Sequence, residues 1–262
     1  NHILISASRW YRIDLNRLNI YEWLLKLDLD GNIIWQKTFG GSQVDGLTNP
    51  IELENGDFML FGSSTSDDGA VGENNGSRDG WVVRIDKDGN LLWSKVFGSF
   101  KSEHFSEAVA LEGGYLIGGT IYHDPRRGSG IPHCEEDIFI TKIDEEGNLI
   151  WSYAYGGTNT DLISSLLKIN EDRFIVTGST YSIQGEGGNL FNRGGAWVFE
   201  IDGEGNMIWN KVLGGSSKDS IKEIIKDKSG NLVQFGNSKS ADGDVGNNYG
   251  RDDIRLAGLG EQ

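Results

Sequence analysis

The sequence predicts an all-β fold of repeated four-stranded antiparallel units, and three observations lead to this fold class. A phrase of the form D-x-x-G-N-x-x-W occurs four times, with 58 residues from one copy to the next. Apolar and polar residues alternate with period two between the turn signals, which is typical of half-buried strands. The chain has 38 glycines and three prolines among 262 residues, a composition that favours many tight turns.

The repeated positions define the units of the chain. A fixed period of this size is typical of repeat architectures, in which each unit is one group of elements. The units are predicted to cover residues 23–80, 81–138, 139–196 and 197–254, within a single domain over residues 1–262. The tryptophans of the phrase are Trp35, Trp93, Trp151 and Trp209, and the acidic residues ten positions later are Asp45, Glu103, Asp161 and Asp219.

Four strands are predicted in the second unit. Residues 81–86 alternate, the turn at 87–89 contains the glycine that a tight hairpin needs, and residues 90–98 are apolar on both faces. A strand of that kind is expected to be covered on both sides. Residues 106–112 and 113–119 give the third and fourth strands. Four short antiparallel strands per repeat are typical of a propeller blade, so the sequence predicts a β-propeller, or an arc of a larger one, with about four and a half repeats.

Two segments also fit a short helix. Residues 219–227 ("DSIKEIIKD") and 161–169 ("DLISSLLKI") space their apolar residues as one face of a helix does. In register they match the segment around Pro50, and proline is unfavourable inside a helix. The repeat therefore favours strands in both segments.

The number of predicted strands leaves the array incomplete. Eighteen strands, from "HILISAS" to "DIRLAGL", do not divide into four-stranded blades. Either the fold closes with an incomplete blade, or the chain is a piece of a longer array. The second alternative is favoured, because a terminal repeat normally has an atypical, capping sequence. The exposed strand edges of such a piece would favour self-association.

Charge and cysteine content argue against several function classes. The formal net charge is −15, and a surface of that sign repels a phosphate backbone, so no nucleic-acid partner is expected. No apolar run reaches membrane-spanning length and no signal peptide is evident, so no membrane insertion is expected. Cys134 is the only cysteine, which excludes an internal disulfide framework. His123 and His133 could pair with Cys134, but the prolines nearby favour a surface loop.

The segments "GSSTSDDGAV" at Gly62 and "GNSKSADGDV" at Gly236 each precede a predicted first strand. These motifs resemble the repeats of β-propellers in large bacterial secreted and surface proteins, and the resemblance covers nearly the whole chain. It implies an extracellular or cell-surface location in a bacterium and a non-catalytic binding or scaffold role. The alternative is a propeller-type glycoside hydrolase or polysaccharide lyase.

The tryptophan phrase is also distantly similar to quinone-type propeller repeats. In those repeats the tryptophan packs against the next blade, which implies that Trp35 and its equivalents are buried apolar plates between blades. The phrase is one residue shorter than theirs between Asp28 and Gly31 and lacks their threonine, so no quinone or other cofactor is implied. The spacing of the aromatic residue and the lack of an arginine cluster also distinguish the chain from Asp-box sialidases.

No catalytic, cofactor-binding or metal-binding residue is predicted. The acidic residue recurs in every unit, which favours a role in capping the turn after the second strand, because a catalytic pair needs two carboxyls in different environments. The phrase at Asp28 does not fit an EF-hand calcium loop, since glycine comes at position four and Phe39 stands at position twelve. Calcium binding stays open for the Asp- and Asn-rich segments 67–79 and 241–253.

Ligand recognition is predicted at four long segments between the fourth strand of one unit and the first strand of the next. They occupy the same place in the repeat but differ in content, and a constant framework with divergent loops is how scaffolds commonly carry recognition. Drift without selection is the alternative. The expected ligand is a glycan or a protein. The segments are Ser63–Gly80, Thr120–Asp137, Ser179–Gly195 and Asn237–Asp253.

Overall fold

The structure is a computed structural model that describes residues 2–12, 18–123, 135–185, 194–245 and 253–259. These residues form eighteen β-strands and one short 3₁₀ helix, η2 (Gly243–Val245). The predicted all-β fold class is therefore confirmed. The number of strands also agrees with the number that the sequence predicts.

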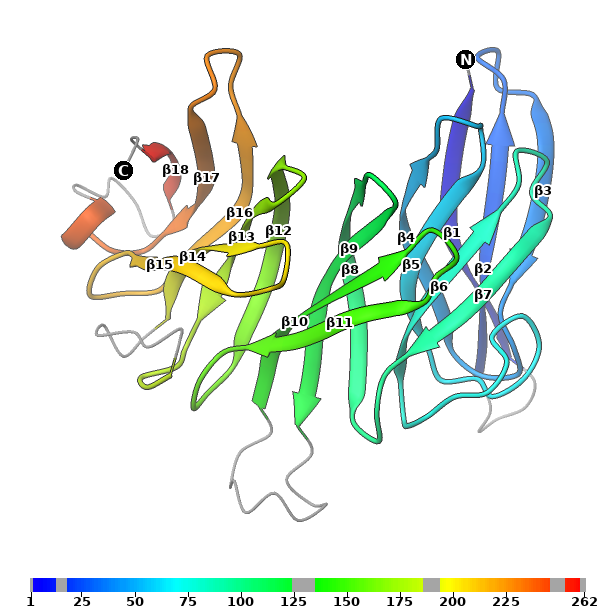
Figure 1. The fold of residues 1–262 in the computed structure, drawn as a ribbon, viewed down its shortest axis with the longest axis horizontal. Coiled ribbons are helices and arrows are strands. Elements are labelled where there is room, and N and C mark those ends of the chain that lie inside the picture. The colour runs from blue at the N-terminus through cyan, green and yellow to red at the C-terminus, as the bar shows by residue number, and fades with distance from the viewer. Residues whose placement is uncertain (1, 13–17, 124–134, 186–193, 246–252, 260–262) are drawn as a thin grey trace. The chain divides into compact units, whose positions relative to one another are not determined.

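The strands form five antiparallel sheets (Figure 1). The chain is divided into two compact units, Asn1–Ala110 and Leu111–Gln262. The two three-stranded sheets consist of β1 (Ile3–Arg12), β2 (Leu18–Leu27) and β3 (Ile33–Phe39), and of β16 (Asp219–Lys226), β17 (Leu232–Ser238) and β18 (Asp253–Leu259). The three four-stranded sheets consist of β4 (Asp45–Glu52), β5 (Phe58–Ser64), β6 (Asp79–Ile85) and β7 (Leu91–Phe97); of β8 (Ser102–Leu111), β9 (Gly114–His123), β10 (Glu135–Asp144) and β11 (Leu149–Tyr155); and of β12 (Asp161–Asn170), β13 (Arg173–Thr180), β14 (Gly195–Asp202) and β15 (Met207–Leu213).

Each four-stranded sheet takes its strands from two consecutive sequence units. β4, β12 and β16 begin at the repeated acidic residue, so the last two predicted strands of one unit pair with the first two of the next. The short connection after the second predicted strand therefore leads from one sheet to the following sheet. The long segments predicted to carry recognition instead join the second and third strands within one sheet, as the segment between β5 and β6 does.

β12 and β16 are strands, as the repeat predicts, and a bulge explains their helix-like spacing. The register of β16 on β17 shifts between Ile221 and Glu223. The extra residue of a bulge moves the next inward position by one, so Ile221 and Ile224 are both buried although they stand three apart. β12 has a similar shift between Ile163 and Ser165. A period of two interrupted by one bulge therefore imitates the period of a helix.

The middle strands of the sheets make the core. Every residue of β5 is buried, and Trp81 of β6 and Trp197 of β14 are 0 % exposed. The prediction that residues 90–98 are covered on both faces is wrong at the start of β7, where Leu91 and Leu92 are 43 % and 51 % exposed. β7 is the last strand of its sheet and has a neighbouring strand on one side only. The period-two pattern of the sequence does not show that these two leucines lie at the edge of the sheet and in solvent.

A glycine in the second strand of three sheets lets the first strand come close. A Cβ atom at Gly62 would lie 2.0 Å from the carbonyl oxygen of Gly46 on β4. Gly62 also stands opposite Trp81 on β6, so no side chain is present where the indole passes. Gly178 and Gly236 are equally close to the first strands of their own sheets. The sheet thus requires glycine at a position where β-propensity alone disfavours it.

Candidate recognition loops and the framework that holds them

The repeated D-x-x-G-N phrase forms a turn that is closed by its own side chains. Asp86 Oδ1 accepts hydrogen bonds from the backbone N–H groups of Asp88 and Asn90 at 2.9 and 2.8 Å, and Oδ2 accepts one from the Asn90 amide at 2.9 Å. These bonds, that of the Asn90 side chain first, hold the pKa of Asp86 below its ordinary value. Gly89 supplies the positive φ of 79°. The two bonds from the asparagine also close the turns at Asp28, Asp144, Asp202 and Asp227.

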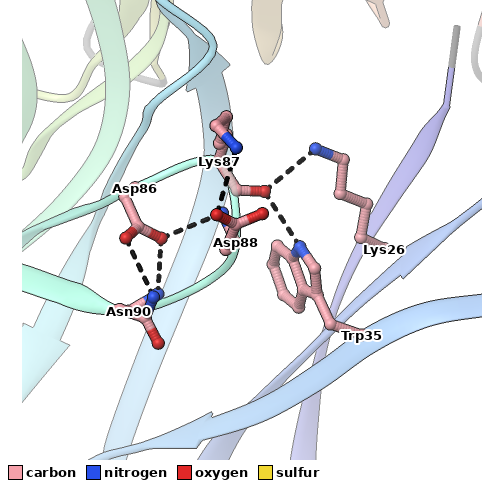
Figure 2. Close-up of polar contacts among 6 residues, drawn as sticks. All are labelled: Lys26, Trp35, Asp86, Lys87, Asp88 and Asn90. Atoms are coloured by element: carbon pink, nitrogen blue, oxygen red, sulfur yellow. Dashed lines mark hydrogen bonds and ion pairs between the residues drawn. The ribbon is translucent and has the colours of Figure 1, made fainter.

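This turn is bound by the tryptophan and the lysine of the preceding sequence unit, as Figure 2 shows. Trp35 Nε1 and Lys26 Nζ both donate to the backbone carbonyl of Lys87, at 3.0 and 3.1 Å. Lys87 directly follows Asp86 in its turn, and a Cβ atom at Gly89 would lie 3.1 Å from the Trp35 ring. The turn between β6 and β7 is therefore held against β2 and β3 of the preceding sheet.

The second compact unit repeats this arrangement. Trp151 Nε1 and Lys142 Nζ both donate to the carbonyl of Gly203, at 3.1 and 2.9 Å. Trp209 departs from the pattern, because Glu200 stands where the other units have a cation, and Trp209 Nε1 donates to this carboxylate instead. Trp35 and Trp151 contact a neighbouring turn, and all four tryptophans of the phrase stay partly exposed, so the expectation of fully buried plates is wrong. A polar indole tip bonded to a surface turn explains this exposure.

The repeated acidic residue caps the turn that precedes it, as predicted. Asp45 Oδ2 accepts from the backbone N–H of Gly41 at 2.6 Å. The four acidic side chains are only 0–3 % exposed, and a substrate has no access to a carboxylate in that position. The equivalent bonds run from Gly157 to Asp161 and from Gly215 to Asp219, both at 2.9 Å, and from Ser99 to Glu103 at 3.2 Å.

Two hydroxyl groups at the start of a long loop bind the same carboxylate. Ser64 Oγ donates to Asp45 Oδ1 at 2.5 Å, and Ser66 Oγ donates to Oδ2 at 2.9 Å. Asp68 then accepts from the backbone N–H of Ser42 at 2.6 Å. This role was not predicted from the sequence, although the S-x-S-x-D spacing of these residues is visible there. The last loop has the same contacts, from Ser238 and Ser240 to Asp219 and from Ser216 to Asp242.

The remainder of the first loop presents polar side chains to solvent. Val71 is 3 % exposed and belongs to the core cluster of its compact unit, so the loop is held by an apolar anchor as well. Asp67, Asp68, Glu73 and Arg78 are exposed. Parts of the other three predicted loops lie outside the described residues, and with them Pro125, Arg126, Arg127, Pro132, His133, Cys134 and Phe191.

No metal centre is found within the part of the chain that the structure describes. No three His, Cys, Asp or Glu side chains gather there as a metal ion would need. Segment 67–79 lies wholly inside the described residues, and segment 241–253 only in part. None of the described helices has the length and the apolar character needed to cross a membrane.

Comparison with known proteins shows similarity to a curated protein and to solved structures. No model of a known family matches the chain. The regulatory protein FlaEY of Caulobacter vibrioides is 24 % identical over 187 residues, which make up 64 % of this chain and 19 % of that protein. The chain therefore spans about a fifth of the length of this relative.

Two solved structures share the arrangement of strands. The subtype N10 neuraminidase-like protein of A/little yellow-shouldered bat/Guatemala has a TM-score of 0.50 at 11 % identity, over 97 % of this chain and 73 % of that chain. A variant of the Synechocystis apocarotenoid oxygenase has a TM-score of 0.50 at 12 % identity, over 90 % and 52 %. At these identities the likeness concerns the fold alone. The neuraminidase fold is a propeller, so the all-β chain with its four-stranded antiparallel sheets has propeller-like structural neighbours.

Proposed function

We propose that the chain is a non-catalytic binding or scaffold module that acts outside a bacterial cell or at its surface. Its ligand, a glycan or a protein, binds to the loops that join the second and third strands of the sheets. The module belongs to a longer array of the same repeats. The resemblance to repeats of secreted and surface propellers supports this location and this role.

One observation carries the proposal. In the loop between β5 and β6, the side chains shared with other repeats point inward and are buried, namely Ser64, Ser66 and Val71. The side chains peculiar to this loop, such as Glu73 and Arg78, are exposed. A loop whose backbone is held by buried side chains loses little conformational entropy when its exposed side chains bind a ligand. That is the property expected of a recognition loop on a rigid scaffold.

The curated relative also favours binding over catalysis. FlaEY is named a regulatory protein, and a regulatory role requires recognition of a partner. The rival function is a propeller-type glycoside hydrolase or polysaccharide lyase, which would need two or three accessible carboxylates at one place. The repeated acids do not serve that purpose, because they are buried and bonded to their own turns.

The experiment is an exchange of loops on a constant framework. Residues 120–137 are replaced by the sequence of residues 63–80, and binding to a glycan array is compared between this variant and the parent chain. We expect the variant to fold, since the loop starts are held by the framework, and to lose or exchange its glycan signals. The matched control changes Lys87 and Asp88, two exposed residues in the short turn between β6 and β7. This control should leave the glycan signals unchanged.

Two results would contradict the proposal. Unchanged glycan binding after each of the four loops has been exchanged in turn would move recognition away from these loops. Release of reducing sugar or unsaturated product from a bacterial polysaccharide by the parent chain would favour the enzyme instead.

A further inference from the structure

Two buried carboxyl groups meet where β6 and β8 begin. Arg78 and Ser102 form a parallel bridge at this place, and the Glu103 N–H donates to the Arg78 carbonyl at 2.7 Å. The residues that follow the two bridge positions are Asp79 and Glu103, both inside the first compact unit. Asp79 is 0 % and Glu103 is 1 % exposed. The backbone bridge thus brings two acidic side chains together away from solvent.

In each carboxyl group, one oxygen accepts a hydrogen bond and the other does not. Asp79 Oδ2 accepts from the Asn75 N–H at 2.5 Å, and Glu103 Oε1 accepts from the Ser99 hydroxyl at 2.7 Å. The other oxygens, Asp79 Oδ1 and Glu103 Oε2, are buried and receive no hydrogen bond from a protein donor. Both lie against Gly98, where a Cβ atom would be 2.6 Å from Oδ1 and 2.8 Å from Oε2. These two oxygens therefore both lie within 2.8 Å of one point, the position that a Cβ atom of Gly98 would take.

Two adjacent carboxylates in such a place cannot both be ionised at low cost. Like charges in contact disfavour a second ionisation, and an unpaired charge without solvent is expensive. Burial is the main cause that raises the pKa of both Asp79 and Glu103, and the charge of Asp79 raises that of Glu103 further. The hydrogen bond between the two side chains raises the pKa of Glu103 and acts against the increase for Asp79. A single proton between Oδ1 and Oε2 would satisfy both oxygens.

We propose that Asp79 and Glu103 share one proton near neutral pH, and that this proton fastens the end of the β5–β6 loop to the start of β8. Loss of the proton leaves two carboxylates that repel each other. The loop end at Asn75 is then loosened, because its N–H is bonded to Asp79. The contact between the loop end and β8 therefore depends on pH. It does not require that a ligand binds to the loop.

The surrounding charges do not replace the proton. The elements that meet here also carry Glu73, Arg78, Lys101 and His104, and β4 carries Asp45. Burial, followed by the charge of Arg78, lowers the pKa of His104, so this side chain is neutral near pH 7. Asp45 is occupied by its own serines and by Gly41. No donor from the two cations reaches Asp79 Oδ1 or Glu103 Oε2.

One repeat later, acidic residues again occupy both positions: Asp137 corresponds to Asp79, and Asp161 corresponds to Glu103. A Cβ atom at Gly156 would lie 2.2 Å from Asp137 Oδ1 and 2.8 Å from Asp161 Oδ2. In the last repeat Gly195 stands in place of the first acid, and Asp219 binds two serine hydroxyls instead. Two junctions thus hold a pair of acids, and the last holds a single acid; Asp161 has both kinds of neighbour, since it also accepts from Ser182 Oγ at 2.7 Å.

The test uses Asp79→Asn, in which the amide can donate permanently to Glu103. The protonated carboxylic acid is detected by infrared spectroscopy of the parent chain with isotope-labelled aspartate and glutamate, and the melting temperature is followed from pH 5 to pH 9. We expect a protonated acid band at pH 7 that is weaker in the variant than in the parent chain. The parent melting temperature should fall as pH rises through the raised pKa, and the variant should lose this part of the slope. The control Asp88→Asn, at an exposed turn position, should keep the parent profile.

Each other outcome decides against the proposal. A parent chain without a protonated carboxyl band at pH 7 would overturn it even if no variant folds, since this readout needs no substitution. Equal pH profiles of the parent, Asp79→Asn and Glu103→Gln would also overturn it. If calcium chloride stabilises the parent but not Asp79→Asn, the pair holds a divalent cation and not a proton.

Discussion

At the scale of single residues, the repeated aromatic positions differ in what they contribute. The tryptophan of the D-x-x-G-N-x-x-W phrase is the most conspicuous residue of the sequence, yet it stays partly exposed. Among the tryptophans whose burial the structure describes, Trp81 and Trp197 are fully buried, and each is the third residue of the third strand of its sheet. Stability follows from the area removed from water and not from the regularity of a motif.

This difference gives a prediction for two alanine substitutions. Trp81→Ala should lower the free energy of unfolding by about 3–5 kcal/mol, because it empties a fully buried site. Trp93→Ala should cost about 2 kcal/mol or less, since part of its side chain already lies in solvent. Urea unfolding of both variants measures the difference. An equal or larger loss for Trp93→Ala would mean that the phrase tryptophan is the principal core residue after all.

At the scale of elements, the fold depends on how closely the first two strands of a sheet approach. β4 and β5 come so near that only a residue without Cβ fits at Gly62. Gly46, on β4 in the same sheet, has open space around a Cβ atom. The two glycines therefore have different roles, although both lie in strands.

Two substitutions within this sheet separate the roles. Gly62→Ala should destabilise the chain by at least about 1–3 kcal/mol, because the strands must move apart to admit the methyl group. Gly46→Ala should change stability by no more than about 0.5 kcal/mol, as expected for a site with free space. Thermal unfolding of both variants provides the measurement. If Gly62→Ala is as harmless as Gly46→Ala, the close approach of the strands is not a feature of the folded chain.

Local signals in the sequence predicted the elements well and their assembly less well. The turn at Asp86 and the alternation before it are local, so the strands on both sides could be read directly. The start of a sheet at Asp45 could not be predicted in this way. It depends on which strands pair with one another, and the sequence of a single strand does not show this. The bulge after Ile221 appears in the sequence only as an ambiguous spacing. The turn at Asp227 has the same D-x-x-G-N signal as the others, but it stands out of register with the repeat and was missed.

The candidate site shows the same division. The loop Ser63–Gly80 is recognisable as a loop, and its polar residues are visible in the sequence. The contact between Asp79 and Glu103 is not, because the two residues stand 24 positions apart and meet only through the bridge between Arg78 and Ser102. Self-association through exposed strand edges stays a prediction.

At the scale of the whole molecule, the repeated phrases form the framework. Each four-stranded sheet joins two halves of neighbouring units. The buried acid that caps a turn begins the first strand of the sheet, and the turn of the D-x-x-G-N phrase is bound by the preceding unit. The loops between the second and third strands, which are not part of this framework, are where we propose that a ligand binds.

Backbone nuclear Overhauser effects in solution test this framework most directly. The account predicts cross-strand contacts between Gly62 and both Leu47 and Trp81, since these residues face one another in the register of β4, β5 and β6. It also predicts cross-strand contacts, and no helical ones, for residues 161–170 and 219–226. Helical contacts in those two segments, or the absence of contacts between Leu47 and Gly62, would contradict it.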